Sequence, residues 1–237
     1  MEDAARCYDR DGYAKLKVFN EPDFRFLEDF SRNWVTKLIL EGANNNPDVT
    51  KMPLEDYHKW WKVMGVEHDG LFHARNRYLT PQGRLKELLH IQAIQEFLTI
   101  IHKGKLVQWA DPGLGWLGFR FIRPGMGDGY PTSCKNWGAA AGVISVWLPI
   151  MGFSSSETIA LVPGSHRKEY KNFLPANQKF TAGELRLAEK IPDHAYIRPE
   201  LEAGDVIFFH PATLHTEDVA ESPITRLNLE YRFKPEY

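Results

Sequence analysis

Two neighbouring stretches near the C-terminal end decide the fold: GDVIFFHPATLHTED at residues 204–218 and TRLNLEYRF at residues 225–233. The first contains the apolar run 206–209, which predicts a buried strand. The second alternates strictly between polar and apolar residues, so it predicts a strand with two different faces. The apolar face carries Leu227, Leu229, Tyr231 and Phe233, and the polar face carries Arg226, Asn228, Glu230 and Arg232.

The polar face of this last strand has two possible environments. It lies in solvent if the strand is isolated or the sheet is open, and it lines the interior if the sheet curls into a barrel. In a barrel, Arg226 needs an anionic partner, because an unpaired buried charge is costly. A dicarboxylate ligand would satisfy the guanidinium through paired hydrogen bonds.

Three histidines lie near these strands. His210 and His215 flank Pro211, which interrupts strand pairing, so alternation does not decide whether both imidazoles face the same side. We place His215 near the end of the strand that begins after Gly204. A third histidine, His166, ends the turn Pro163-Gly164-Ser165-His166, and its simplest interpretation is an exposed residue of a tight turn.

The order of helical and strand patterns predicts an α+β chain that is mainly β. In the largely helical first hundred residues we predict helices from Pro22 to Gly42, from Leu54 to Met64, and from Thr80-Pro81 to Gly104. Short apolar runs with Gly and Pro turns then predict strands at 115–123, 143–150, 158–162, 196–198, 206–209 and 225–233. Such strands form a sandwich or barrel, with the helices packed on one sheet.

Composition narrows the class of protein. The formal net charge of −2 gives no electrostatic footprint for nucleic acid. Two cysteines, Cys7 and Cys134, are far apart in sequence, which suits a reducing compartment rather than a disulfide framework. The acidic start MEDA is unlike a signal peptide, and no apolar run is long enough to span a membrane. We expect a cytoplasmic protein with a small-molecule substrate and no nucleic-acid or membrane partner; the sequence does not indicate an oligomeric state.

Several motifs together resemble the phytanoyl-CoA dioxygenase-like family of iron- and 2-oxoglutarate-dependent oxygenases. They are WLP at 147–149, LVPGSH at 161–166, GDVIFFHP at 204–211, Leu214-His215 and Arg226, and the resemblance covers about residues 115–235. It implies a double-stranded β-helix (a jelly-roll, cupin-like barrel) buttressed by N-terminal helices. We therefore expect one oxygenase-like domain over 1–237, with a helical buttress at 1–110, the barrel at 111–237 and an insertion near 168–194.

The resemblance also implies roles for particular residues. His215 corresponds to the distal iron ligand, Arg226 to the residue that pairs with the 2-oxoglutarate carboxylate, and Trp147 to an aromatic residue of the co-substrate pocket. Asn228, on the face of Arg226, is a further candidate for co-substrate binding. His210 corresponds to a position that is usually not a ligand.

One part of the family pattern is missing. The family supplies its other two iron ligands as His-x-Asp or His-x-Glu before the strand of Trp147, within residues 126–135 here. That segment reads MGDGYPTSCK, which contains no His and only one carboxylate, Asp128. If Ser133-Cys134-Lys135 occupies the motif, Ser has replaced the His and Lys has replaced the acid.

Three interpretations of this departure stay open. Iron binds at His215 with other ligands, of which Asp128 is our first choice and Cys134, His73 and His102 are further ones. Alternatively, the barrel does metal-free acid–base chemistry with Lys135, Glu230 and His215. In the third, the chain is a binding or regulatory relative that holds an anionic molecule through Arg226, helped by Lys135 and Arg120. The first interpretation is an Fe(II)/2-oxoglutarate-dependent dioxygenase that hydroxylates a small molecule.

Overall fold

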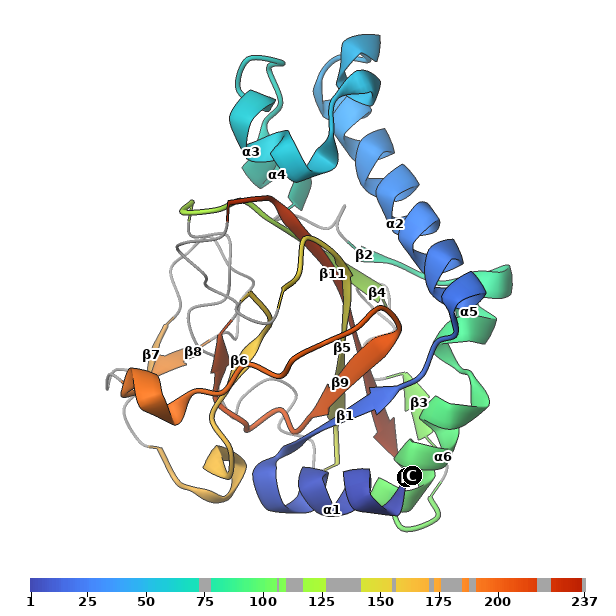
Figure 1. The fold of residues 1–237 in the computed structure, drawn as a ribbon, viewed down its shortest axis with the longest axis vertical. Helices are drawn as coiled ribbons and strands as arrows, with labels where there is room; N and C mark the ends of the chain where they lie inside the picture. The colour runs from blue at the N-terminus through green and yellow to red at the C-terminus, as the bar shows by residue number, and fades with distance from the viewer. Residues whose placement is uncertain are drawn as a thin grey trace.

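Most of the strands form a large and a small antiparallel sheet, and two further strands pair only with each other, in the computed structural model, which describes residues 1–72, 78–105, 107–109, 117–126, 142–154, 157–170, 173–175, 185–187, 191–216 and 223–235. The large sheet has the order β1-β9-β5-β11-β4-β2, and β3 also pairs with β11. Its strands are β1 (Tyr13–Lys17), β2 (Tyr78–Leu79), β3 (Val107–Trp109), β4 (Leu117–Ile122), β5 (Ile144–Met151), β9 (Asp205–Phe209) and β11 (Arg226–Pro235). The small sheet, which lies across the barrel from it, pairs β6 (Ala160–Leu161) with β10 (His215–Thr216) (Figure 1).

Strand β11 lies in the middle of the large sheet, and its two faces contact different parts of the molecule. Its apolar residues pack into the main core together with helical residues such as Leu27, Val35 and Leu89. Its polar residues face the other way, toward the small sheet, and yet Arg226 is only 2% exposed and Asn228 is fully buried. The polar face therefore lines the interior of a barrel, and the predicted double-stranded β-helix with helices on one sheet is confirmed.

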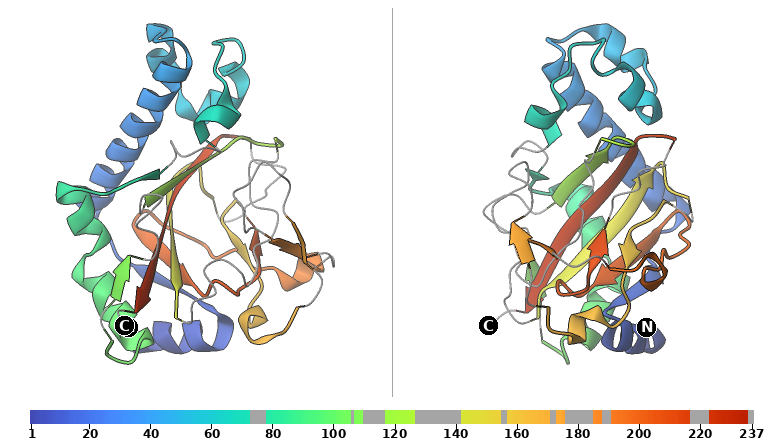
Figure 2. Two further views of the ribbon diagram at one scale, coloured as in Figure 1. Left: turned by 180° about the vertical axis from the view of Figure 1, so that it is seen from behind. Right: turned by 90° about the vertical axis from the view of Figure 1, so that its left-hand side faces the viewer.

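The helices lie outside the barrel, where some cover the outer face of the large sheet and others lie beyond its two ends (Figures 1 and 2). They are α1 (Glu2–Asp11), α2 (Glu21–Gly42), α3 (Tyr57–Trp60), α4 (His68–Phe72), α5 (Gly83–Leu89) and α6 (Gln92–Ile101), with short 3-10 turns at Pro47–Lys51, Leu54–Asp56, Ser165–Arg167 and Asp193–Ala195. None of the helices in the described ranges has the length and apolarity that crossing a bilayer would require.

The first predicted helix is confirmed almost to the residue. Helix α2 begins after Asn20, whose side chain accepts a hydrogen bond from the backbone N–H of Asp23, and Pro22 lies in its first turn. It ends at Gly42, directly before the Asn-rich loop.

Two other helical predictions are wrong in detail. The segment from Leu54 to Met64 contains a 3-10 turn and the four-residue helix α3 rather than one helix. The helix predicted from Thr80-Pro81 to Gly104 is instead two helices, α5 and α6, which are separated at His90 and Ile91. The N-cap residue of α5 is Gln82. Ile91 is extended (φ −52°, ψ 148°), and the His90 ring packs edge-on against Phe233, so a tertiary contact accompanies the break.

The strand predictions agree with β4, β5, β6, β9 and β11, and the predicted strand at 196–198 is a single bridge between Ile197 and Leu161. Strand β1 was not predicted: it pairs with β9 and places an N-terminal strand at the sheet edge. The segment 168–194 is described only in part, where β7 (Phe173–Pro175) pairs with β8 (Leu185–Leu187).

Candidate functional site

His215 does not belong to the strand that follows Gly204, contrary to our prediction. Strand β9 ends at Phe209, Pro211 lies in the intervening turn, and His215 begins the separate strand β10, opposite Leu161 of β6. Proline has no N–H for strand pairing, which explains the interruption.

The turn at 163–166 holds this part of the barrel in place. Ser165 is fully buried, and its hydroxyl donates to the carbonyl of Val162 (2.7 Å) and accepts from the N–H of Leu214 (2.8 Å). The N–H of Val162 donates to the carbonyl of Leu214 (2.9 Å). Ser165 thus fixes the backbone immediately before His215.

Replacing Ser165 by Ala should lower the free energy of unfolding by about 1–3 kcal/mol, because the buried N–H of Leu214 loses its acceptor. Urea denaturation measures this change. Thr99→Ala is the control, since its hydroxyl makes an exposed hydrogen bond within α6 and its loss should cost less than about 0.5 kcal/mol. Equal effects of the two changes would contradict the proposed role of Ser165.

His215 is held in one tautomer. Its Nδ1 lies 2.8 Å from the carbonyl of Thr213, and because a carbonyl only accepts, Nδ1 carries the hydrogen and Nε2 keeps its lone pair. The ring packs 4.6 Å from the ring of Phe209. Burial lowers the pKa of His215 to about 4, so the imidazole is neutral at pH 7. A neutral imidazole with a free Nε2 is the form that binds a metal.

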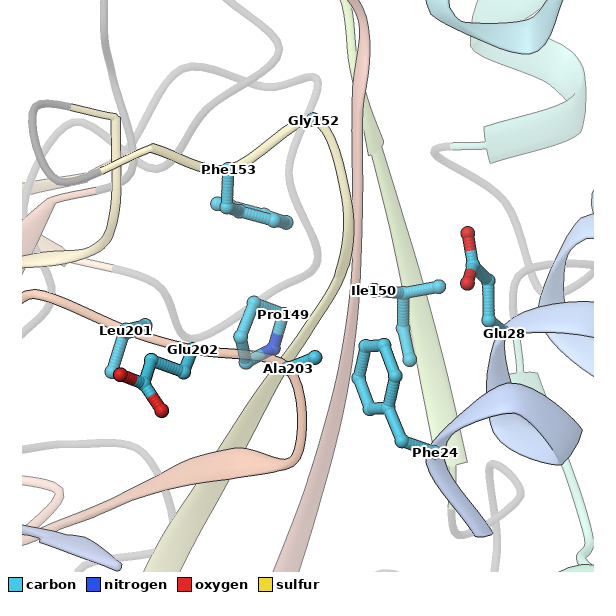
Figure 3. A pocket seen from close by; sticks show the side chains of 9 residues that line it. All are labelled: Phe24, Glu28, Pro149, Ile150, Gly152, Phe153, Leu201, Glu202 and Ala203. Atoms are coloured by element: carbon cyan, nitrogen blue, oxygen red, sulfur yellow. The ribbon is translucent and has the colours of Figure 1, made fainter. Parts of the chain in front are cut away.

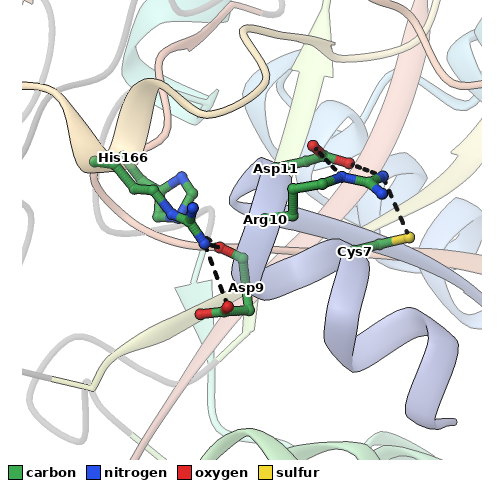
Figure 4. A network of polar contacts seen from close by, with 6 residues as sticks. Cys7, Asp9, Arg10, Asp11 and His166 are labelled. Carbon is green, nitrogen blue, oxygen red and sulfur yellow. Dashed lines mark hydrogen bonds and ion pairs between the residues drawn. The ribbon is translucent and has the colours of Figure 1, made fainter.

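The other two histidines lie together at the α1 end of the barrel. The ring of His166 is 5.4 Å from that of His210, and its Nε2 donates to the carbonyl of Asp9 (3.2 Å). Figure 4 shows His166 beside the last turn of α1, where Arg10 and Asp11 form an ion pair. The Nδ1 of His210 accepts from the N–H of Ala212 (3.0 Å). His166 therefore lies in the predicted turn, but it is half-buried between α1 and His210 rather than exposed.

Two of the predicted co-substrate residues, Arg226 and Trp147, lie on neighbouring strands and meet at a third side chain. The Arg226 guanidinium lies 5.8 Å from the ring of Phe153, and Trp147 packs edge-on against the same ring (5.0 Å). Arg226 also donates from Nη1 to the carbonyl of Glu157 (2.8 Å). Asn228 lies opposite Pro149 on β5 and faces the same interior. Phe153 and the Glu157 carbonyl were not predicted, since no motif marks them.

A pocket of about 280 Å³ opens beside Phe153 at the edge of the large sheet. Strand β9 pairs with β5 only from Ser145 to Trp147, so the end of β5 is left beside the loop that contains Leu201. Figure 3 shows Phe153, Pro149 and Leu201 on one side of β5, and Phe24 and Ile150 on the other. The pocket therefore adjoins the surroundings of Arg226.

Glu230 is bound by an arginine inside the barrel. Both Nε and Nη2 of Arg120 donate to its Oε2 at 3.0 Å. Burial by itself raises the pKa of Glu230, but the charges of Arg120 and Arg232 outweigh it, so the pKa falls to about 2. Glu230 and His215 also affect each other electrostatically. The site thus contains an ionised carboxylate near a neutral imidazole.

The described residues fit the co-substrate more completely than the metal. A buried Arg226 with Asn228 and two aromatic rings suits a carboxylate-bearing ligand. For a metal, His215 offers one ligand, and no cluster of three or more His, Cys, Asp or Glu residues occurs within the described ranges. The candidates Asp128, Cys134, Lys135 and His73 fall outside those ranges. His102 follows α6, which packs against α1 and β3, so it does not join His215.

Comparisons with known proteins agree with this description. Residues 137–218 match the sequence model of the phytanoyl-CoA dioxygenase (PhyH) family. No curated protein matches the chain. Among solved structures, a non-heme monooxygenase, ThoJ, is similar with a TM-score of 0.59 and 14% identity, covering 98% of this chain and 77% of ThoJ.

Two further structures have the same fold. The epimerase SnoN, solved in complex with Fe3+, alpha ketoglutarate and nogalamycin RO, has a TM-score of 0.53 and 14% identity over 99% of this chain and 83% of SnoN. EctD from S. alaskensis, with bound Fe, has a TM-score of 0.57 and 14% identity over 99% of this chain and 76% of EctD. The resemblance to the phytanoyl-CoA dioxygenase family that the motifs predicted is therefore confirmed, on a barrel shared with non-heme oxygenases.

Proposed function

We propose that the protein is an iron- and 2-oxoglutarate-dependent oxygenase that oxidises a small molecule. The observation that carries the proposal is the pairing, in one barrel, of a neutral His215 whose Nε2 is available with a buried Arg226 beside Trp147 and Phe153. These two residues have the order and spacing of the family's distal ligand and co-substrate arginine. Hydroxylation is the reaction that we expect.

The chain's own residues have distinct tasks in this proposal. Arg226 binds the far carboxylate of 2-oxoglutarate, and the Glu157 carbonyl holds the guanidinium in place. Asn228 adds a polar contact, and the rings of Trp147 and Phe153 exclude water around the ion pair. His215 holds the iron through Nε2, and Asp128 remains the candidate for a further ligand. Bound iron would supply the activation of oxygen.

Anaerobic titration of metal-free protein with Fe(II) and 2-oxoglutarate tests the proposal. The wild type should develop the visible charge-transfer band of the chelated complex, and His215→Ala should lose the band and the succinate release. His194→Ala is the matched control, since His194 is exposed on the turn at Asp193–Ala195. A band that survives in His215→Ala would contradict the assignment of the ligand.

One observation favours a second candidate function, a metal-free relative that binds an anion or does acid–base chemistry. Arg120 and Arg232 place two positive charges near His215, and the sequence lacks the usual His-x-Asp motif. Glu230, His215 and Lys135 would then be the acid–base groups. In the same titration, this alternative gives 2-oxoglutarate binding without a band and without dependence on Fe(II).

A further inference from the structure

The segment that follows β5 contacts Arg226 at three points. Gly152 has φ +77°, and an added Cβ there would lie 3.2 Å from Cγ of Arg226, so the backbone passes directly over the stem of this side chain. The centre of the Phe153 ring lies 5.8 Å from the guanidinium carbon, within the range of a cation–π contact. The carbonyl of Glu157 accepts a hydrogen bond from Nη1 at 2.8 Å. Backbone, ring and carbonyl together determine where the guanidinium lies.

The ring of Phe153 also borders the pocket of about 280 Å³, together with Pro149 and Leu201 (Figure 3). Arg226 is not among the described residues that line this pocket, although it contacts Phe153. The ring therefore separates the guanidinium from the pocket. Trp147, which is only 1% exposed, packs edge-on against the ring at 5.0 Å and supports it from within the barrel.

We propose that Phe153 sets the length of the 2-oxo diacid that the protein accepts, because its ring prevents the guanidinium of Arg226 from moving toward the pocket. This inference rests on the proposed function, in which Arg226 binds the far carboxylate of 2-oxoglutarate. It adds the residue that determines the distance at which that carboxylate is bound. Phe153 is a positioning residue, since it acts on the ligand through Arg226.

The physical reason is that a diacid held at both ends fits only when its length matches the distance between them. With the guanidinium fixed, a diacid with one further methylene group has to adopt a compressed conformation or displace Arg226. Closely packed surroundings resist such a displacement. Replacing the ring by a methyl group gives the guanidinium room toward the pocket, so the longer diacid then fits.

Calorimetry with Mn(II) present tests the inference without relying on activity, with 2-oxoglutarate and the longer 2-oxoadipate as the two ligands. The wild type should bind 2-oxoglutarate at least about 10-fold more tightly, since one methylene group is typically discriminated about 10- to 200-fold. Phe153→Ala should weaken the binding of both diacids, because water then reaches the ion pair. It should also abolish or reverse the preference between them, and the ratio of the two affinities removes the shared loss. Phe153→Leu should give an intermediate ratio.

Phe24→Ala is the matched control. Phe24 lines the same pocket, but it lies on the other side of β5 from Phe153 (Figure 3). Its replacement therefore enlarges the pocket without releasing Arg226, and the preference for 2-oxoglutarate should stay as in the wild type. An equal loss of preference in Phe24→Ala and Phe153→Ala would overturn the inference, because the size of the pocket would then decide the length of the ligand.

The outcomes separate this inference from the proposed function. If the wild type prefers 2-oxoglutarate and a folded Phe153→Ala keeps the full preference, the length is set elsewhere and the proposed oxygenase stands. A wild type that binds both diacids equally well also overturns the inference alone. If the wild type binds neither diacid, both fail. Melting temperatures check folding, and if Phe153→Ala does not fold, an unchanged preference in Phe153→Leu overturns the inference.

Discussion

Replacing Arg226 by Gln should weaken the binding of 2-oxoglutarate at least about 100-fold, measured by calorimetry with Mn(II) present. Each hydrogen bond between charged groups contributes about 1.5–3 kcal/mol, and 1.4 kcal/mol corresponds to a factor of ten. Arg226 is only 2% exposed, so little water can replace the lost contacts. Arg226→Lys should restore only part of the affinity, because an ammonium does not form the paired contact.

The control for this prediction is Arg167→Gln. Arg167 is half-exposed and pairs with Asp9 of α1, on the outside of the barrel. Its replacement should leave the affinity for 2-oxoglutarate unchanged. Wild-type affinity in a folded Arg226→Gln would show that the co-substrate arginine has been assigned wrongly.

Gly204→Ala should be among the most destabilising single changes, lowering the free energy of unfolding by about 2–4 kcal/mol in urea denaturation. Gly204 has φ +87°, and an added Cβ would lie 2.2 Å from the carbonyl oxygen of Phe19. The Gly204 carbonyl accepts from the N–H groups of Val18 and Phe19, so the backbone cannot move away without losing these bonds. This contact joins the turn before β9 to the segment between β1 and α2.

Gly65→Ala separates the two causes of this effect. Gly65 also has positive φ (+71°), but an added Cβ there meets nothing within 4 Å. It should cost only about 1–2 kcal/mol, the penalty of a left-handed backbone with a side chain. Similar losses at Gly65 and Gly204 would mean that the close approach to Phe19 contributes nothing.

Local patterns predicted much of the fold. The strict alternation of β11, the apolar runs of β5 and β9, and the capped start of α2 are properties of neighbouring residues, so they can be read from the chain alone. The break at His90 and Ile91 and the pairing of β1 with β9 depend on contacts between distant residues. The hydrophobic periodicity of a sequence reflects neighbouring residues only, so it does not indicate such long-range contacts.

The candidate site also has a part that the sequence predicted and a part that only the tertiary structure decided. Residue types and spacing resemble those of a family, and this resemblance indicated His215, Arg226 and Trp147. It also showed that the family's His-x-Asp motif is missing from residues 126–135. Only tertiary structure decided that Ser165 holds the backbone of Leu214, that the Thr213 carbonyl selects the tautomer of His215, and that Arg120 occupies one oxygen of Glu230. The physical reason is that hydrogen bonds, burial and the pKa values that follow from them are set by the three-dimensional surroundings of a group, whereas the sequence determines only which groups are available.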